Sequence, residues 1–256
     1  MESIELIKNN YKERIKDIVG KCISNSKGEY DVSTVNVYII DESENGKVLS
    51  ITKIKRLNDI PFLKLYDLDK GQGSIIVLFK DTVFTNLKIA LRKFCITFIE
   101  KSKHKIQNLS ILNHNGFGSL LYINKNFSCN GAELRLWEFK NIFIGNDVMF
   151  TWGIRLFTSD GHLIFDNEKN VINPPGDIVI GDHVWIGHDV KILKGVFLNS
   201  NNIVGAGSLI SKPIIDTNVI LSGVPAVIKK SGVLWSRNHI EPKNYKVFLQ
   251  EILSLR

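Results

Sequence analysis

A six-residue spacing of aliphatic residues in the second half of the sequence constrains the fold most strongly. From Ile180 the aliphatic positions recur at Ile186, Ile192, Leu198, Val204 and Ile210. A strand has a period of two residues and a helix one of 3.6, so neither element alone produces a period of six. Six residues can form one flat strand and a corner, so three hexapeptides close a triangular coil. The spacing therefore predicts a mainly β protein, a parallel β-helix whose coils bury a continuous core by stacking.

The residues beside the repeated positions fit the same interpretation. Glycine follows the aliphatic position at Gly181, Gly187 and Gly205, and a residue without Cβ relieves crowding where the backbone bends. The phase continues backwards to Ile144 and is lost at Glu138. We therefore assign residues 113–230 to the β-helix and expect about five coils.

The segments on either side predict two further units. Residues 4–18 carry an apolar stripe at helical spacing, and residues 84–98 carry a second one. The sequence predicts strands over residues 35–40, 74–79 and 105–112. We therefore expect a small α/β domain over residues 1–112, of unknown role, and a short helical extension over residues 231–256. No glycine-rich phosphate loop follows a strand, so the sequence does not indicate a nucleotide-binding domain.

Composition excludes several classes of protein. No apolar run approaches the ~20 residues of a membrane span, and residues 1–17 lack the apolar core of a secretory signal, so we expect a cytoplasmic protein without a transmembrane segment. The three cysteines are far apart and indicate neither a disulfide framework nor a metal site. The net charge is +7, but the lysines are scattered, so we expect no nucleic-acid partner; an anionic ligand would use the same charge.

The repeat fails between Leu156 and Ile180, although the interval is still a multiple of six. Here the sequence TSDGHLIFDNEKNVINPPGD would place His162, Glu168 and Pro174 at inward positions. We predict instead a loop that leaves the coil near residue 159 and returns near residue 177. Loops held on a rigid scaffold often carry functional residues.

Four segments resemble a known family. The segments VWIGHDVKILKGV, IVGAGSLISK and SGVPAVI, within residues 135–230, resemble the hexapeptide-repeat acyltransferases, and TSDGHLIFD resembles the sugar O-acetyltransferases of that superfamily. These include galactoside and maltose enzymes and those that modify capsule, polysialic acid or O-antigen. The resemblance implies a left-handed β-helix, acetyl-CoA as co-substrate, and homotrimers with active sites between subunits. The expected function is acetyl transfer to a sugar hydroxyl of a surface polysaccharide or its precursor.

The resemblance also assigns roles to individual residues. It makes His162 the general base, and a neutral imidazole can indeed take a proton from an attacking hydroxyl. Asp160 is a candidate for orienting the ring, and Trp185 and Trp152 are candidates for lining the acceptor site, since an exposed indole can pack on a sugar face.

Small residues and lysines form the expected donor site. By the resemblance, small residues let backbone groups approach the pantetheine arm of CoA, and lysines suit its phosphates. The residues assigned to CoA are Gly187, Gly205, Ala206, Ser211, Lys212 and Lys230. The sequence has no G-x-S-x-G motif and no cysteine in the matched catalytic segment, so we expect direct transfer without an acetyl-enzyme and without a metal.

Three other functions stay open at this point. An N-acetyltransferase of an amino-sugar nucleotide would use the same scaffold and donor. His183 and His188 are five residues apart, as in a zinc site of the γ-class carbonic anhydrase type, which would need a third histidine. A noncatalytic β-helix scaffold would need neither His162 nor a CoA site.

Overall fold

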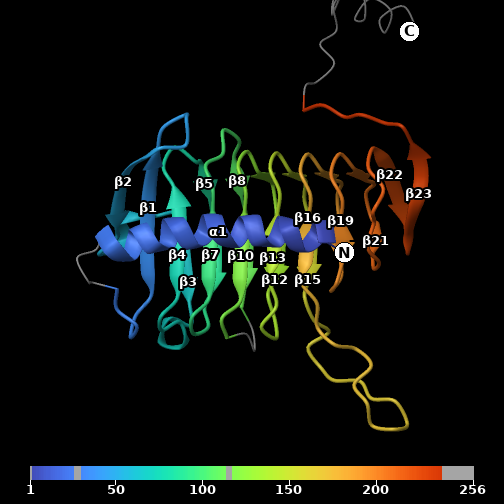
Figure 1. Ribbon diagram of the computed structural model, residues 1–256, viewed down its shortest axis with the longest axis horizontal. Helices are drawn as coiled ribbons and strands as arrows, with labels where there is room; N and C mark the ends of the chain where they lie inside the picture. Colours follow the sequence, from blue (N-terminus) through green and yellow to red (C-terminus); the bar gives the residue numbers. More distant parts are fainter. Residues whose placement is uncertain (1, 26–29, 114–116, 238–256) are drawn as a thin grey trace, which may run out of the picture.

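The computed structural model describes residues 2–25, 30–113 and 117–237, and these form a parallel β-solenoid with one helix along its side (Figure 1). Three sheets form the sides of the solenoid, and from β4 to β21 successive strands join them in the order A, C, B. Each corner is named here by the two sheets that it joins: A–C, C–B and B–A. The prediction of a mainly β protein built as a parallel β-helix is confirmed.

The strands of each sheet are as follows. Sheet A contains β1 (Asn36–Glu42), β2 (Val48–Lys53), β4 (Ile75–Phe79), β7 (Ile96–Ile99), β10 (Leu120–Ile123), β13 (Ile142–Ile144), β16 (Ile178–Ile180) and β19 (Phe197–Leu198). Sheet C contains β5 (Phe84–Thr85), β8 (Ile106–Gln107), β11 (Ser128–Cys129), β14 (Met149–Phe150), β17 (Trp185–Ile186), β20 (Ile203–Val204), β22 (Val219–Gly223) and β23 (Ala226–Ser231). Sheet B contains β3 (Leu63–Tyr66), β6 (Leu87–Ala90), β9 (Leu109–Leu112), β12 (Ala132–Arg135), β15 (Ile154–Phe157), β18 (Lys191–Ile192) and β21 (Leu209–Ile210). Two short 3-10 helices, η1 (Leu57–Asp59) and η2 (Leu68–Lys70), lie in the first coil.

The solenoid begins much earlier than residue 113. Strand β1 pairs with β4, and β4 pairs with β7, in parallel within the same sheet as the later coils. The segment expected to form an α/β domain is therefore one helix plus the first coils of the solenoid. Within the described residues sheet A contains seven parallel strands, so the protein has about seven coils rather than five.

The length of the coil explains why the sequence pattern concealed these early coils. Ile186 pairs with Val204, eighteen residues later, whereas Ile96 pairs with Leu120, twenty-four residues later. The extra residues lie at the corners and destroy the six-residue phase, although the inward positions remain apolar. Sequence periodicity detects this fold only where every corner has the same length.

The helix predicted over residues 84–98 is wrong, because that stretch forms β5, β6 and the start of β7. Phe84, Leu87 and Leu91 are all buried in the prism. The chain turns a corner between them, so residues three or four apart point inwards from different sheets. A solenoid corner can therefore imitate the apolar spacing of a helix.

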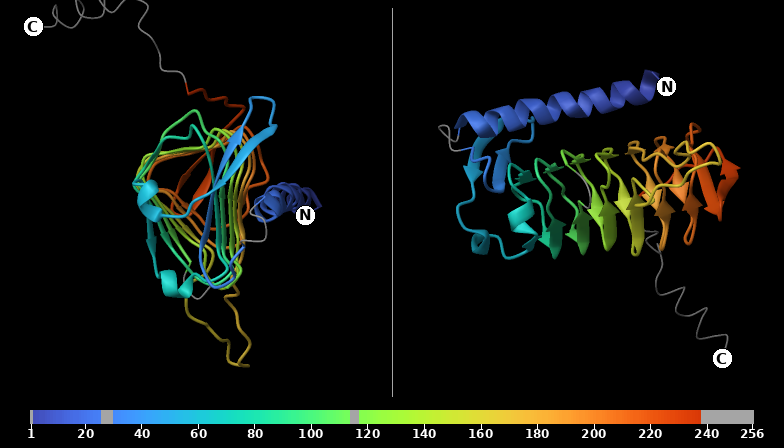
Figure 2. Two further views of the ribbon diagram at one scale, coloured as in Figure 1. Left: turned by 90° about the vertical axis from the view of Figure 1, so that its left-hand side faces the viewer. Right: turned by 90° about the horizontal axis from the view of Figure 1, so that it is seen from below.

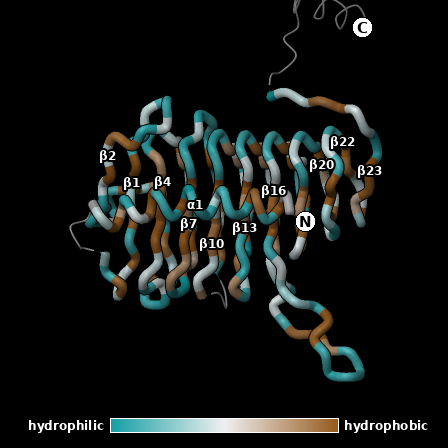
Figure 3. The backbone as a smooth tube through the Cα atoms, in the orientation of Figure 1, coloured by the Kyte–Doolittle hydropathy of each residue, from teal (hydrophilic) through white to brown (hydrophobic). Residues whose placement is uncertain are grey.

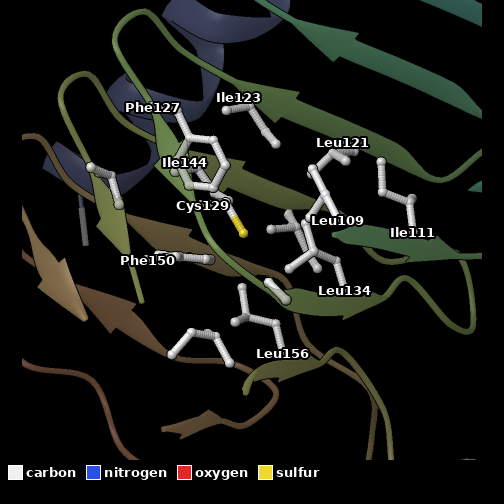
Figure 4. Packing of buried hydrophobic residues seen from close by; sticks show 14 of the residues in the cluster. Leu109, Ile111, Leu121, Ile123, Phe127, Cys129, Leu134, Ile144, Phe150 and Leu156 are labelled. Atoms are coloured by element: carbon white, nitrogen blue, oxygen red, sulfur yellow. The ribbon is translucent and has the colours of Figure 1, made fainter. Parts of the chain in front are cut away.

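Stacked aliphatic side chains fill the interior of the prism (Figure 4). Ile111, Leu134 and Leu156 occupy the same register position in consecutive strands of sheet B and are fully buried. At the bends the coils approach closely: a Cβ on Gly187 would lie 2.7 Å from the carbonyl oxygen of Val204 in the next coil. Glycine is needed there because any side chain would separate the two coils.

The helix α1 (Glu2–Asn25) lies along the outer face of sheet A (Figure 2). Its predicted apolar stripe is confirmed, since Ile15 and Ile18 are buried and the Tyr11 ring stacks on Tyr122 at 4.7 Å. Strand β4 is buried at every position because one face points into the prism and α1 covers the other. Figure 3 shows the corresponding apolar strands of sheet A beside the helix.

Arg14 fastens this helix to two buried carboxylates. Its Nε donates to Glu100 Oε1 at 2.8 Å, and its guanidinium also donates to Glu42 Oε1 at 2.5 Å. The side chains of Glu42 and Glu100 are each 1% exposed. Burial by itself raises the pKa of Glu42, but hydrogen bonds from Arg14 and Lys125 outweigh it and hold that pKa below its ordinary value. The helix is therefore joined to the solenoid by a buried ionic contact as well as by apolar packing.

None of the helices in the described residues is long and apolar enough to cross a membrane. After β23, residues 232–237 return across the solenoid. The helix expected within residues 231–256 would fall mostly on residues 238–256, which lie outside the described part of the chain.

We predict that Arg14→Met lowers the free energy of unfolding by about 3 kcal/mol at pH 7, because it leaves the buried Glu100 without its cation and Glu42 with Lys125 alone. The folded-state pKa of Glu42 is depressed, so its stabilising contribution exists above about pH 4.3 and is lost as pH falls through the lower folded-state value. The difference between wild type and variant should therefore narrow below about pH 4. Urea denaturation at several pH values measures this difference in unfolding free energy.

The matched control is Lys16→Met on the exposed side of the same helix, where the lysine side chain is 79% exposed. That variant should unfold within about 0.5 kcal/mol of wild type at every pH. Equal losses in the two variants would show that Arg14 acts only through helix propensity.

Candidate functional site

The loop of residues 158–177 projects from the B–A corner between β15 and β16 (Figure 1). Leu156 pairs with Ile192, thirty-six residues later, which is twice the regular eighteen-residue coil. The insertion therefore equals one coil in length, which is why the six-residue phase survives across it. A bridge between Phe165 and Val171 makes its outer part a hairpin. The predicted excursion from the coil is confirmed.

The previous coil holds the foot of the loop. The Ser159 hydroxyl donates to Glu138 Oε2 at 2.5 Å and accepts the N–H of Gly161 at 2.9 Å. Gly161 has a φ of +81°, and a Cβ there would lie 2.9 Å from the Trp137 ring. The glycine that precedes His162 is thus required both by backbone conformation and by close packing.

Asn173 fixes the backbone on both sides of His162. Its Nδ2 donates to the carbonyl oxygen of His162 at 2.9 Å and to Asp160 Oδ2 at 2.8 Å, and its Oδ1 accepts the N–H of Ile164 at 2.7 Å. The side chain of His162 is exposed. The loop therefore presents an accessible imidazole on a backbone that is held in place.

Asp160 pairs with Lys194 of the following coil, and the same Lys194 Nζ donates to the Asn173 carbonyl at 2.9 Å. The hydrogen bond from Lys194 is the main cause that lowers the pKa of Asp160, with Asn173 adding to it. In the described residues no hydrogen bond joins Asp160 to the His162 ring. The contacts of Asp160 anchor the loop, and its role in orienting the His162 ring stays a prediction.

Trp152 lies at the C–B corner, where its ring stacks on His188 of the next coil at 4.8 Å with 14° between the planes. Both side chains are exposed. In the coil after that of His188, the C–B corner is formed by the small residues Gly205, Ala206 and Gly207, of which Ala206 and Gly207 are exposed. Gly187 is buried beneath them, and a Cβ on it would lie 2.8 Å from the Ala206 nitrogen.

Trp185 points outward from β17 in sheet C and is 36% exposed. The ring of Trp235, from the segment that follows β23, lies 6.0 Å from it and stacks on His183 at 4.2 Å. Arg237 Nε donates to Asp147 Oδ1 at 2.6 Å. Burial alone raises the pKa of Asp147, but its hydrogen bonds with His183 and Arg237 hold that pKa below its ordinary value.

The zinc alternative finds little support in these contacts. His183 Nδ1 lies 2.7 Å from Asp147 Oδ2, and its Nε2 lies 3.2 Å from the Trp235 carbonyl oxygen. Both partners are acceptors, so a metal would have to displace one of them. Across residues 2–25, 30–113 and 117–237, no group of three histidine, cysteine or carboxylate side chains is placed to hold a metal ion.

The residues assigned to CoA lie at the carboxyl end of the solenoid. Ser211 and Lys212 follow β21 and are exposed, as is Lys230 on β23. Ala206 and Gly207 lie at the C–B corner before β21, and Ser211 and Lys212 lie at the B–A corner after it, so small residues and a cation flank this strand. A long flexible ligand with a phosphate end fits this combination of small and cationic residues.

One chain does not bring all these residues together. His162 belongs to the B–A corner, whereas Trp152 and Ala206 belong to the C–B corner, at the opposite edge of sheet B. Within the described part of the chain no hydrogen bond or ring contact joins His162 to either of them, or to Trp185.

Two residues that position the loop were not identified from the sequence. Asn173 lies eleven residues after His162, and Lys194 lies thirty-four residues after Asp160. Only the hexad count could have indicated Lys194, because it places residue 194 at the B–A corner one coil beyond the loop.

Comparison with known proteins identifies relatives of the repeat region. No protein-family model matches the chain. The galactoside O-acetyltransferase of Lactococcus lactis is 34% identical over 114 residues, which are 44% of this chain and 51% of that protein. The polysialic acid O-acetyltransferase of Escherichia coli O1:K1 is 40% identical over 98 residues, 38% of this chain and 32% of that protein.

The repeat region is similar in sequence to the hexapeptide-repeat O-acetyltransferases. The chain spans about half the length of the curated galactoside relative and about a third of the polysialic acid relative. The solved structure of a polysialic acid O-acetyltransferase superposes with a TM-score of 0.59 at 24% identity, covering 74% of this chain and 98% of that one. This second similarity shows that the solenoid fold is shared.

We predict that Asn173→Ala loosens the loop without unfolding the solenoid. The amide of Ile164, which donates to Asn173 Oδ1, should exchange its hydrogen at least about tenfold faster, because local opening becomes easier. The melting temperature should stay within about 2 °C of wild type, since the loop buries little apolar surface. Hydrogen exchange measured by NMR or mass spectrometry compares the loop with the strands of the solenoid.

Asn170→Ala provides the control, because Asn170 bonds to Asp166 at the tip of the same loop. It should speed exchange at the tip and leave Ile164 unchanged. Unchanged exchange at Ile164 in Asn173→Ala would contradict the anchoring role.

Proposed function

We propose that the protein is an acetyl-CoA-dependent O-acetyltransferase that acts on a sugar hydroxyl of a surface polysaccharide, such as capsule or O-antigen, or of its precursor. The observation that carries the proposal is the exposed imidazole of His162 on an anchored loop that interrupts an acyltransferase-like solenoid. The O-acetyltransferases related to the repeat region support the reaction class.

In this mechanism His162 acts as the general base. A ring nitrogen takes the proton of the acceptor hydroxyl, which increases the nucleophilicity of its oxygen. Asn173 holds the His162 carbonyl and the Ile164 amide, so the ring is presented from a fixed backbone. Fixing the base in this way reduces the entropy lost on reaching the reactive arrangement.

The donor site is assigned to the C–B corner and the carboxyl end of the solenoid. Acetyl-CoA supplies the acetyl group as an activated thioester when bound. Ala206 and Gly207 leave the backbone accessible, and Lys212 and Lys230 provide positive charge for the phosphates. Gly187 acts indirectly, by letting the coil of Ala206 approach.

We further propose that the active protein is a homotrimer whose sites lie between subunits. His162 and Ala206 lie at opposite edges of sheet B in one chain, so a loop from a second subunit would complete the site. The helix α1 covers sheet A, which leaves sheets B and C for contact between subunits. The loop also exposes Leu163 and Phe165, each more than half accessible, which a neighbouring subunit would cover.

If the protein is a homotrimer, analytical ultracentrifugation at micromolar concentration should give the sedimentation coefficient of three associated copies. A Leu163→Asp/Phe165→Asp variant should shift the protein towards monomer, because two charges would be buried at the contact. A wild-type protein that sediments as a monomer would contradict the shared site.

The catalytic proposal predicts that His162→Ala binds acetyl-CoA like the parent and loses a factor of about 10²–10⁴ in turnover, the usual range for general-base assistance. A screen of acetyl-CoA consumption across saccharides first identifies the acceptor. NMR of the product then establishes the linkage, with an ester labile to mild base expected. A base-stable amide would instead indicate N-acetylation of an amino sugar.

Trp185→Ala is the comparison variant. It should raise KM for a substrate more than it lowers kcat, because an aromatic wall contributes to binding and orientation. If His162→Ala keeps more than about a third of wild-type turnover, the base lies elsewhere.

A further inference from the structure

Three exposed phenylalanines form a ladder along the B–A corner, one from each of three successive coils. Phe94, Phe117 and Phe139 are 41%, 52% and 61% exposed. The ring centroids are 5.3 Å apart between Phe94 and Phe117 and 6.4 Å apart between Phe117 and Phe139, both in edge-to-face geometry. This corner runs along the lower edge of the solenoid in Figure 1. Exposed apolar surface of this kind indicates a binding surface.

The backbone at two of these positions disfavours phenylalanine. Phe94 has a φ of +56° and Phe139 a φ of +61°. Of the fourteen non-glycine residues with positive φ in the described ranges, nine are asparagine or aspartate, the residues that tolerate this conformation best. A bulky side chain there is strained, and at Phe139, which is 61% exposed, little burial offsets the strain. Folding alone therefore does not explain why this corner carries phenylalanine.

The neighbouring coil accommodates the ring of Phe94. A Cβ on Gly73 would lie 2.4 Å from Phe94 Cε1, so only glycine leaves room for the ring at that place. One face of Phe94 thus lies against the backbone of Gly73, while the ring remains partly open to solvent.

The ladder leads to the loop that carries His162. Phe139 directly follows Glu138, whose carboxylate accepts the Ser159 hydroxyl at the foot of the loop. Ser159 in turn accepts the N–H of Gly161, the residue before His162. The last ring of the ladder is therefore connected to the candidate base through two hydrogen bonds.

Cations lie at the other end of the ladder. A hollow of about 380 Å³ beside Phe117 is lined by Lys70 and Lys93, together with Asp69, Gln72 and Arg92. Arg92 and Lys70 are both paired with Asp67, at 2.9 Å and 3.4 Å. The three cations therefore face two carboxylates, Asp67 and Asp69, and the cluster keeps a net charge of +1. The surface thus combines flat apolar rings with positive charge, which suits an acidic glycan: sugar C–H faces pack on aromatic rings, and carboxylates pair with lysine.

We propose that Phe94, Phe117 and Phe139 form a track that binds an extended acidic polysaccharide and leads it to His162. This inference rests on the proposed function and makes it more specific. The acceptor is then a polymer that lies across several coils, rather than a monosaccharide or a nucleotide sugar. Contact with the glycan then accounts for the presence of phenylalanine at positions with a strained backbone.

Affinity electrophoresis through gels containing hyaluronan, polygalacturonate or dextran tests the track. An acidic polysaccharide should retard the wild type and His162→Ala equally, and the affinity of Phe94→Ala/Phe139→Ala should fall at least tenfold. Leu49→Ala, which removes a 61% exposed side chain from β2, is the control and should behave like wild type. The proposal would be overturned if none of the three polymers retards the wild type, or if the double variant is retarded as strongly as the wild type. A changed oligomeric state in the double variant would overturn it as well.

Phe139→Asn separates binding from folding. Asparagine tolerates positive φ, so the melting temperature should rise by about 2–4 °C while polysaccharide affinity falls. A lower melting temperature would show that the ring serves packing and would overturn the functional role. Transfer assays distinguish the two proposals: equal kcat/KM on monosaccharide and polymer overturns the track alone, whereas retention of binding without transfer to any saccharide overturns the transferase alone.

Discussion

The structure depends on parallel hydrogen bonding between consecutive coils, because no coil can bury its own apolar side chains. Each inward residue, such as Ile111, Leu134 or Leu156, packs on its counterpart one coil away. Any residue added at one corner must therefore be accommodated outside the strands. This explains why coils of eighteen to twenty-four residues can share the same three sheets. It also explains why the inserted segment of residues 158–177 projects from a corner, where it leaves the register undisturbed.

The helix α1 gives the three faces of the prism different properties. It covers sheet A with apolar residues and with Arg14, whose contacts with Glu42 and Glu100 would be lost if the helix separated. Sheets B and C remain accessible, and the candidate residues lie on these sheets or at corners beside sheet B. The direction in which a second subunit or a substrate can approach is therefore set by a helix that touches none of the candidate residues of the site.

The B–A corner combines several independent features. It carries the anchored loop of His162, the Asp160–Lys194 pair and the three exposed phenylalanines. The loop is anchored by short polar side chains, whereas the ladder exposes rings on a strained backbone. A polymer bound along this corner would run parallel to the solenoid axis, so the same stacking that builds the core would also space the binding positions.

The sequence by itself determined the parallel β-helix, the insertion at residues 158–177 and the helical stripe of α1, because these depend on the spacing of apolar residues along the chain. Spacing failed where corners vary in length: residues 84–98 imitate a helix, and the first coils appeared to form a separate domain. Only the tertiary structure showed that Asn173 and Lys194 hold the loop, that α1 covers sheet A, and that His162 and Ala206 lie at opposite edges of sheet B. These are relations between residues that folding brings to neighbouring coils or keeps apart, and local periodicity carries no information about them.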